Sequence, residues 1–559
     1  MKILKFGFCF CLGIVILMIG FSVLLDGCGK VKPEENTTAT TPTLPAPSSL
    51  TATADTLQVT LSWEAVSSAS SYNIYWSNSS GVTNKAIGTK INGVTSPYNH
   101  SSLINGQTYY YIVLAVDNAS NEGTPSSQVS ATPQSIGTLD ATFNGNGYYI
   151  KNDVAGGNAA RGRSITIDSL GKILVTGYSS NISGNDDMVI LRYNLDGTLD
   201  STFGSNGIVV NNNAAGGNSA DWGNSIAIDS SGRILIAGCS INSTGNYDMV
   251  IWRYNSDGTL DNTFGSNGIV VNNNAAGGNS TDWGNSIAID SSGRTLVAGY
   301  SRNVGGNCDM VIWRYNSNGT LDTTFDGDGI VVNNNAAGGN FDDAGNSIAV
   351  DSSGRILVAG YSWGASSNSD MAIWRYNSNG TLDTTFDGDG IVVNNNAAGG
   401  NSDDVGNSIA IDSSGRILVA GYSWGSGSNN DMVIWRYNSN GTLDTTFDGD
   451  GIVVNNNAAG GNSDDIAYSI CVDSIGKILV AGYSWNNTGN CDIVVWRYNS
   501  NGILDTMFDA DGIVTFHIPS GTHDDFARTI ATDSSGKILV AGYATYIGGK
   551  NDLIVWRYK

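Results

Sequence analysis

The sequence from residue 137 to its end is a tandem repeat, and this constrains the fold more than any other feature. The motif Gly-x-Leu-Asp begins at residues 137, 197, 258, 319, 380, 441 and 502, so the period is 61 residues and once 60. Repeats of this length are typical of solenoids and propellers, in which each copy buries its apolar surface against its neighbours. We therefore treat residues 134–559 as seven copies of one structural unit.

Each copy contains four short apolar segments separated by turn residues. In the fifth copy these segments are residues 391–394, 408–412, 417–423 and 432–438. The intervening Asp-Ser-Ser-Gly is typical of a turn, because the Asp side chain caps its own turn and Gly accepts a positive φ. Seven copies of four strands predict an all-β structure, a seven-bladed β-propeller of four-stranded blades.

The ends of the repeat region indicate a closed ring and not an open solenoid. A solenoid needs polar caps, but the last copy ends in the apolar segment 553–558, and the first copy opens with an unpaired strand at residues 147–151. We predict that this N-terminal strand completes the last blade as its outer strand, which removes exposed edges. The small residues of segment 408–411 suit the inner rim, and the bulkier segment 432–435 suits the wider outside.

The sequence motifs of the repeat resemble those of a known family. Gly-Thr-Leu-Asp-x-Thr-Phe-x-x-x-Gly followed by Asp-Ser-Ser-Gly-Arg-Ile-Leu-Val-Ala-Gly is similar to the delta-60 repeat β-propeller family, and the resemblance covers residues 137–559. It implies the propeller fold and brings no specific activity.

Residues 48–133 have a different pattern, with alternating apolar runs at 59–63, 72–76 and 109–116 that predict an antiparallel β-sandwich. Leu-Ser-Trp at 61–63 and the segment from Leu103 to Tyr109 resemble a fibronectin type III domain. The resemblance implies that Trp63 fills the core between the sheets and that Tyr109 is the corner tyrosine that bonds back to the chain.

Residues 1–28 are typical of an export signal, with Lys2 and Lys5 before an apolar run that ends at Leu25. The end of this segment resembles a bacterial lipobox, with Cys28 as the lipidated residue, although Asp26 stands where a small neutral residue is usual. The alternative is an uncleaved membrane helix, since twenty apolar residues can cross a bilayer. Both predict a protein anchored in the cell envelope and facing outward, and the Thr- and Pro-rich segment 29–47 is interpreted as a disordered stalk.

Charge and motif content exclude several functions. The net charge of −23 repels nucleic acid, and the scattered cysteines predict neither a disulfide framework nor a zinc site. The Gly-x-Ser-x-Gly runs at 360–364 and 421–425 close a predicted strand, where a hydrolase would need a strand, a turn and a helix. His517 and His523, beside Asp524 and Asp525, fit no zinc spacing and are interpreted as loop residues.

Two further recurring features are interpreted as structural. The Arg of Trp-Arg-Tyr recurs in each copy, although Leu191 replaces the Trp in the first. This Arg needs a carboxylate partner, either the Asp of Gly-x-Leu-Asp or the Asp before Met432. Asn316 to Asp322 echo a calcium loop, but Arg314 and Phe325 occupy ligand positions. Ordinary turns are therefore favoured over calcium, and no cofactor or metal is predicted.

The candidate ligand surface is the propeller face on which the copies differ most. We expect the loops 395–407 and 424–431, with their equivalents, on this face. Aromatic rings beside carboxylates suit sugars or cationic peptides, and the candidate ligand-binding residues are acidic pairs and tryptophans: Asp342, Asp343, Asp403, Asp404, Asp464, Asp465, Asp524, Asp525, Trp222, Trp283, Trp363, Trp424 and Trp485.

These observations favour a surface-exposed binding or adhesion scaffold whose ligand is a glycan or a protein. The alternative is a secreted polysaccharide-acting enzyme, a hydrolase or lyase, that uses carboxylates of the same face for acid and base chemistry. Binding is favoured because the acidic pairs recur too evenly to mark one active site, so no catalytic residue is predicted. Solvated loops without a ligand, or a purely structural role in the envelope, are the remaining alternatives.

Overall fold

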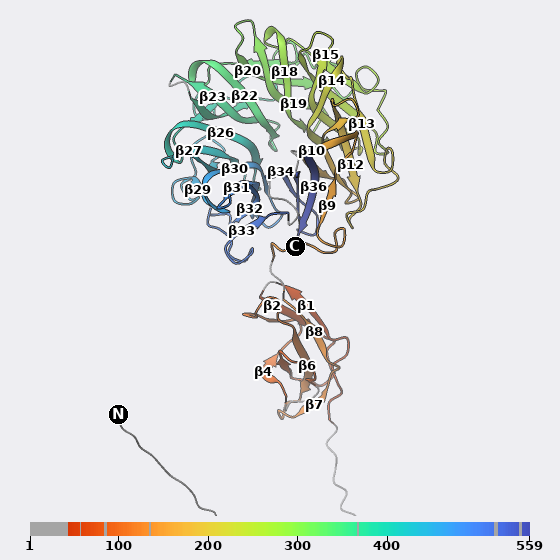
Figure 1. Cartoon of the computed structure of the whole chain (residues 1–559). Coiled ribbons are helices and arrows are strands. Elements are labelled where there is room, and N and C mark those ends of the chain that lie inside the picture. The colour runs from red at the N-terminus through yellow and green to blue at the C-terminus, as the bar shows by residue number, and fades with distance from the viewer. Residues whose placement is uncertain are drawn as a thin grey trace, which may run out of the picture.

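The computed structural model describes residues 43–559 except 56, 83–86, 134–135, 366–367, 519–523 and 547–549, and every regular element in this part is a β-strand (Figure 1). No helix among these residues has the length and apolarity to cross a membrane. The predicted export signal with Cys28, and the stalk before residue 43, lie outside the described residues. So does His523.

The N-terminal domain is a sandwich of two antiparallel sheets. One sheet contains β1 (Thr51–Asp55), β2 (Gln58–Ser62) and β5 (Tyr98–His100), and the other contains β4 (Thr89–Val94), β3 (Ser71–Ser77), β6 (Tyr109–Val116) and β7 (Glu122–Pro125), with β8 (Val129–Ala131) also paired to β6. Trp63 is 6% exposed and packs edge-on against Tyr72 in the core. The hydroxyl of Tyr109 accepts a hydrogen bond from Ile104 N at 3.0 Å. Both positions expected from the fibronectin type III resemblance are confirmed.

The C-terminal repeats form seven four-stranded antiparallel sheets in the part of the chain that the structure describes, and Figure 1 shows them arranged as a ring. Strands are given from the axis outward. Blade 1 is β10 (Gly156–Ile167), β11 (Ile173–Asn181), β12 (Asp186–Tyr193) and β13 (Ile208–Asn211), and blade 2 is β14 (Gly216–Ile228), β15 (Ile234–Asn242), β16 (Tyr247–Tyr254) and β17 (Ile269–Asn272). Blade 3 is β18 (Gly277–Ile289), β19 (Thr295–Asn303), β20 (Cys308–Tyr315) and β21 (Ile330–Asn333), and blade 4 is β22 (Gly338–Val350), β23 (Ile356–Gly364), β24 (Ser369–Tyr376) and β25 (Ile391–Asn394).

The remaining three blades complete the ring. Blade 5 is β26 (Gly399–Ile411), β27 (Ile417–Gly425), β28 (Asn430–Tyr437) and β29 (Ile452–Asn455), and blade 6 is β30 (Gly460–Val472), β31 (Ile478–Asn486), β32 (Cys491–Tyr498) and β33 (Ile513–Phe516). Blade 7 is β34 (Asp525–Thr532), β35 (Ile538–Tyr546), β36 (Lys550–Tyr558) and β9 (Tyr148–Lys151). Each blade therefore takes its outer strand from the next copy of the repeat, and blade 7 takes it from the start of the repeats.

The predicted closure of the ring is confirmed. Strand β9 pairs with β36 through Tyr148 and Trp556, Tyr149 and Val555, and the two following pairs. On the inner rim, each blade from 2 to 7 donates a backbone N–H to a serine hydroxyl of the preceding blade, as Ile226 N does to Ser164 Oγ. Ile165 N completes this circle by donating to Thr529 Oγ1 at 3.2 Å across the seam.

Apolar side chains pack between neighbouring blades, which explains why the copies need one another. The cluster between blades 4 and 5 joins Leu357 and Met371 of one blade to Val419 and Trp435 of the next, all fully buried. The indole N–H of Trp435 donates to Asn394 Oδ1 at 2.9 Å, so its polar atom is satisfied. Burial on both faces of each sheet accounts for the near-continuous apolar character of the middle strands.

The buried arginines of Trp-Arg-Tyr pair with the Asp of Gly-x-Leu-Asp, the first of the two partners considered. Arg314 Nη2 lies 2.8 Å from Asp322 Oδ2, and its guanidinium carbon lies 4.4 Å from the centre of the Phe325 ring. Arg314 also donates to the carbonyl of Ser378 in the next copy. One side chain thus neutralises a carboxylate, covers an aromatic ring and joins two blades, which is a structural role.

Two loop boundaries differ from the sequence expectation. Residues 395–407 were expected to be a loop, but β26 begins at Gly399 and reaches past Asp404 through irregularities in its pairing with β27. A polar, Gly-rich sequence is typical of a loop and does not predict this strand. The structure needs the glycine, since a Cβ at Gly400 would lie 2.2 Å from Trp424 O. The second expected loop, 424–431, shrinks to residues 426–429, because β27 ends at Gly425 and β28 begins at Asn430.

Candidate functional site

Three of the acidic pairs lie on the inner strands β22, β26 and β30 and not in loops as expected, while in the fourth pair Asp524 directly precedes β34 and Asp525 begins it. The second Asp of each pair is almost fully buried: Asp343, Asp404, Asp465 and Asp525 are 0 to 2% exposed. Asp404 accepts hydrogen bonds from Asn396 N at 2.8 Å and Ala397 N at 3.3 Å, so it caps the turn that enters its own strand. These carboxylates stabilise the backbone of the turn.

The first Asp of each pair joins neighbouring blades. Asp403 Oδ1 accepts from Ser369 N of the preceding blade at 2.9 Å, and Asp342, Asp464 and Asp524 accept in the same way from Cys308, Asn430 and Cys491. The even recurrence of the pairs therefore follows from two repeated backbone contacts. Both carboxylates of a pair therefore serve the fold, one within its blade and one between blades.

Burial gives some of these carboxylates unusual titration. Desolvation raises the pKa of Asp343 and of Asp465 to about 6, against the opposing effect of hydrogen bonds from Ser362 and Ser484. The folded protein then keeps protons that the unfolded chain has released, so stability falls as pH rises from about 4 to about 6.

We expect the melting temperature to be higher at pH 4.5 than at pH 7.5, with each of these two groups contributing about 2 kcal/mol to the difference. Differential scanning calorimetry between pH 4 and 8 measures it. Replacing Asp343 and Asp465 together by Asn should make the profile less steep, while the exposed Asp328→Asn should leave it unchanged. An unchanged slope in the double variant would contradict the assignment.

The five candidate tryptophans occupy two different positions in the blade. Trp222 and Trp283 lie on the inner strands β14 and β18, where blades 4 to 6 have Ala344, Val405 and Ile466. Trp363, Trp424 and Trp485 lie at the ends of the second strands β23, β27 and β31. All five are partly exposed, but they do not form one surface.

A continuous group of rings joins the inner strands of blades 2 and 3 to the second and third strands of blades 1 to 3, and we call it the aromatic surface. It consists of Tyr178, Trp222, Tyr247, Trp283 and Tyr300. Tyr178 stacks on Trp222 with ring centres 4.9 Å apart, Tyr247 lies 4.9 Å from Trp283, and Trp283 stacks on Tyr300 at 6.0 Å. The indole N–H of Trp222 donates to Asp186 Oδ2 at 3.1 Å, which fixes its ring. The three tyrosines were not among the sequence candidates.

A polar channel runs along the axis of the ring and is lined by the inner strands of all seven blades. Trp283 contributes to its wall. Two residues after the position of Trp283, blades 2 to 5 carry an asparagine, and each amide donates to a carbonyl of the next blade, as Asn285 Nδ2 does to Gly345 O at 3.0 Å. Blades 6, 7 and 1 carry Tyr468, Arg528 and Arg163 at this position, and these also line the channel.

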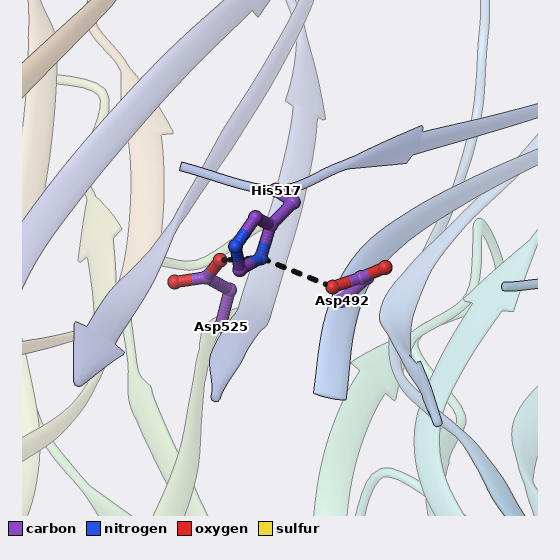
Figure 2. Close-up of side chains that lie close together, drawn as sticks. All are labelled: Asp492, His517 and Asp525. Carbon is purple, nitrogen blue, oxygen red and sulfur yellow. Dashed lines mark ion pairs between the residues drawn. The ribbon is translucent and has the colours of Figure 1, made fainter. Parts of the chain in front are cut away.

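A histidine and two carboxylates meet near the rim of blades 6 and 7 (Figure 2). His517 Nδ1 lies 3.2 Å from Asp492 Oδ1 and 3.2 Å from Asp525 Oδ2. Burial raises the pKa of Asp525, and the nearby His517 opposes that rise. The ligand atoms are close enough to hold a cation such as zinc. The spacing of the sequence could not predict this group, because Asp492 lies on β32, far from the histidine in the chain. Asp524, which is close to His517 in sequence, instead accepts a hydrogen bond from Cys491 N.

Other motif interpretations concern hydroxyls and turns. Ser362 and Ser423 of the Gly-x-Ser-x-Gly runs are fully buried and accept hydrogen bonds from Ala337 N and Ala398 N. In the calcium-like turn, Asn318 Oδ1 accepts from Thr320 N and its hydroxyl. Both segments use their polar atoms within the fold.

Comparison with known proteins identifies the repeats. The family model described as a domain of unknown function (DUF5122) beta-propeller matches residues 171–203, 230–264, 291–325, 352–386, 413–447, 476–508 and 534–559. A beta-propeller repeat model matches residues 337–366 and 397–427.

Two curated proteins match short parts of the chain. A poly(3-hydroxybutyrate) depolymerase from Ralstonia pickettii is 41% identical over 108 residues, which are 19% of this chain and 20% of that protein. An amylopullulanase from Thermoanaerobacter thermohydrosulfuricus is 41% identical over 76 residues, 14% of this chain and 5% of that protein. The chain thus spans a fifth or less of each relative.

Solved structures resemble the two domains separately. An Fn3-like protein from Clostridium thermocellum is 31% identical, with 16% of this chain and 92% of that chain covered and a TM-score of 0.15. A protein of unknown function from Dyadobacter fermentans is 10% identical, with 74% and 98% covered and a TM-score of 0.37. The sequence motifs, the closed ring of blades and the family match agree. The C-terminal part of this chain is built from DUF5122 β-propeller repeats, and an N-terminal Fn3-like domain precedes it.

Proposed function

We propose that this protein is a carbohydrate-binding scaffold of the cell envelope, and that its propeller holds the ligand on the aromatic surface of blades 1 to 3. The observation that carries the proposal is the partly exposed Trp283, whose ring lines the axial channel and continues into the neighbouring rings of that surface. Flat aromatic faces stack on the apolar faces of sugar rings, and neighbouring amides supply hydrogen bonds.

The comparison of copies supports this assignment. Trp222 and Trp283 stand where other blades carry Ala344, Val405 and Ile466, so the fold does not need an indole at this position. Tyr247 likewise stands where blade 4 has Ser369. The tyrosines at the position of Tyr178 and Tyr300 recur in most blades, but the two indoles do not. Two adjacent indoles that the repeat does not require are better explained by a ligand than by packing.

The placement outside the cell rests on the N-terminal sequence. The export-signal pattern of residues 1–28, with Cys28 as the anchor, supports attachment to a membrane by a lipid or by a retained helix. The Fn3-like domain then acts as a spacer between the membrane and the propeller. Labelling with a radioactive or clickable palmitate, compared between the native chain and Cys28→Ser, tests the lipid anchor.

Removing the indoles is expected to weaken glycan binding about tenfold for each ring, the effect of one aromatic contact of roughly 1.4 kcal/mol. A glycan array identifies the ligand, and titration calorimetry compares the native protein with Trp283→Val and Trp222→Ala. Both changes install the residue of another blade, so folding should be retained.

Trp424→Thr is the matched control, because this tryptophan lies on a second strand away from the aromatic surface and blade 7 carries Thr545 there. It should bind like the native protein. Native affinity in Trp283→Val, or array binding to peptides and not to glycans, would overturn the proposal. The alternative of a polysaccharide-acting enzyme gains no support from the acidic pairs, because their carboxylates hold the backbone.

A further inference from the structure

One repeat position that lines the channel carries asparagine in four blades and a different residue in the other three, which are adjacent. Asn224, Asn285, Asn346 and Asn407 each donate to a carbonyl of the next blade at 2.8 to 3.1 Å. Tyr468, Arg528 and Arg163 replace this asparagine in blades 6, 7 and 1, and both arginines face the channel. Since asparagine at this position fastens one blade to the next, the replacements give up a stabilising contact.

These two arginines differ from the other buried arginines of the propeller. Each Arg of Trp-Arg-Tyr lies within 3.3 Å of a carboxylate oxygen. Within the described ranges, Arg163 and Arg528 have no ion pair, although the protein has a net charge of −23. The guanidinium of Arg163 makes no hydrogen bond there, Arg528 makes one long bond of 3.4 Å to Tyr543, and Nε of both is buried without an acceptor.

Aromatic rings hold the two side chains in place and leave most of their donors unused. The guanidinium carbon of Arg528 lies 3.9 Å from the centre of the Tyr468 ring, and that of Arg163 lies 5.4 Å from Tyr178. A cation above an aromatic ring is attracted to its face, while the N–H groups of guanidinium point outward in its own plane. Positive charge and free donors are therefore presented together at the channel wall.

We propose that Arg163 and Arg528 form an anion-binding site in the axial channel that takes one oxyanion group, a carboxylate, sulfate or phosphate. Planar guanidinium groups bind such oxygens through paired hydrogen bonds, and a partly buried setting strengthens the contact. An anion would supply the acceptors that the fold leaves out. Hydroxyl groups of the same ring, such as those of Ser164 and Thr529, line the channel beside the arginines.

The anion site also refines the ligand class, and this step rests on the proposed carbohydrate function. Trp283 lines the same channel as the two arginines. A sugar that carries an acidic group would place its ring on the aromatic surface and its charge on the arginines. The preferred glycan is then an acidic one, such as a uronic acid or a sulfated sugar.

Titration calorimetry of the full-length protein in low-chloride buffer tests the site, with sulfate, phosphate, glucuronate and neutral glucose as separate probes. We expect one saturable site for at least one of the three anions. Arg163→Asn and Arg528→Asn should each weaken it at least tenfold, and the double variant should abolish it. Both variants restore the asparagine of blades 2 to 5, so folding should be preserved, and thermal melting checks this. Tighter binding of glucuronate than of sulfate indicates a sugar acid, and the reverse indicates a free inorganic anion.

Arg302→Gln is the charge-matched control, because Arg302 is exposed and lies on β19 outside the channel lining. It should bind the anions normally. Absence of saturable anion binding by the native protein, or an equal loss in Arg302→Gln, would overturn the anion site. Trp283→Val separates the two proposals: it should keep sulfate binding even if it loses glycan, whereas Arg163→Asn should keep the binding of neutral glycans.

Discussion

A chain that lacks residues 134–151 is expected to lose the cooperative folding of its propeller. The deletion removes β9 and leaves β36 as an open edge. It also removes Asp140, whose loss costs about 3–5 kcal/mol by breaking a buried ion pair, and the fully buried Phe143, which costs about 3–5 kcal/mol more. The sum matches the whole stability of a typical domain. Circular dichroism and calorimetry measure the loss, and size-exclusion chromatography detects association through the free edge.

A circular permutant provides the control for this deletion. Lys559 N donates to Thr138 O, and Gly137 N donates to Lys559 O. Inside the ring, Asn438 N donates to Thr442 O and Gly441 N to Asn438 O in the same way. Joining Lys559 directly to Ser135 therefore reproduces the spacing from Arg436 to Gly441, and new termini can be opened in the turn after Asp168. This permutant should unfold cooperatively with near-native stability. A stable, monomeric deletion chain would show that the closing strand is dispensable.

Replacing Asp140 alone by alanine is expected to lower the free energy of unfolding by about 3–5 kcal/mol. Asp140 Oδ2 accepts from Lys537 Nζ at 2.6 Å and from Arg557 Nε at 2.9 Å, and the residue is 1% exposed. Both cations belong to the last copy, so their charges lose their partner across the seam. Urea denaturation of the two proteins measures the difference.

The same carboxylate should make the native protein less stable at acid pH. Burial opposes ionisation, but hydrogen bonds from Lys537 and Thr142 and the charge of Arg557 hold the pKa of Asp140 well below its usual value. Its stabilisation is therefore complete above the pKa of the unfolded chain and is lost as pH falls below about 4. Asp140→Ala should weaken this acid dependence. The exposed Asp196→Ala is the control and should cost less than about 1 kcal/mol. A similarly small cost at Asp140 would contradict a stabilising role for its ion pairs with Lys537 and Arg557.

The repeat made the fold predictable, because period, strand number and the unmatched strand at 147–151 each have a direct structural meaning. Loop boundaries were less accessible. The segment Gly399 to Asn407 is polar and rich in glycine, which indicates a loop by composition, whereas the structure uses Gly400 for close approach between strands. Periodicity cannot detect a strand whose side chains cap turns and face a polar channel.

The candidate site was predictable only in part for a related reason. The sequence predicts that two loops of each copy bring all five tryptophans to one face, but Trp283 lies on the inner strand β18 and Trp424 on the second strand β27. The arginines of the channel could have been found by aligning the seven copies, because Arg163 and Arg528 replace an asparagine at one repeat position. Their lack of a carboxylate partner depends on distances between blades, which the sequence does not contain.

The borrowed outer strand also bears on how the chain finds its correct pairing. Strands β21, β25 and β29 share the sequence Ile-Val-Val-Asn, so during folding any of them fits the edge of several blades equally well. The closing strand is different: Tyr148 packs against Phe516 and Tyr149 against Tyr193, which no other copy can imitate. The unique seam thus selects the register of the whole ring, because a chain that skips a copy leaves this strand without its matching edge.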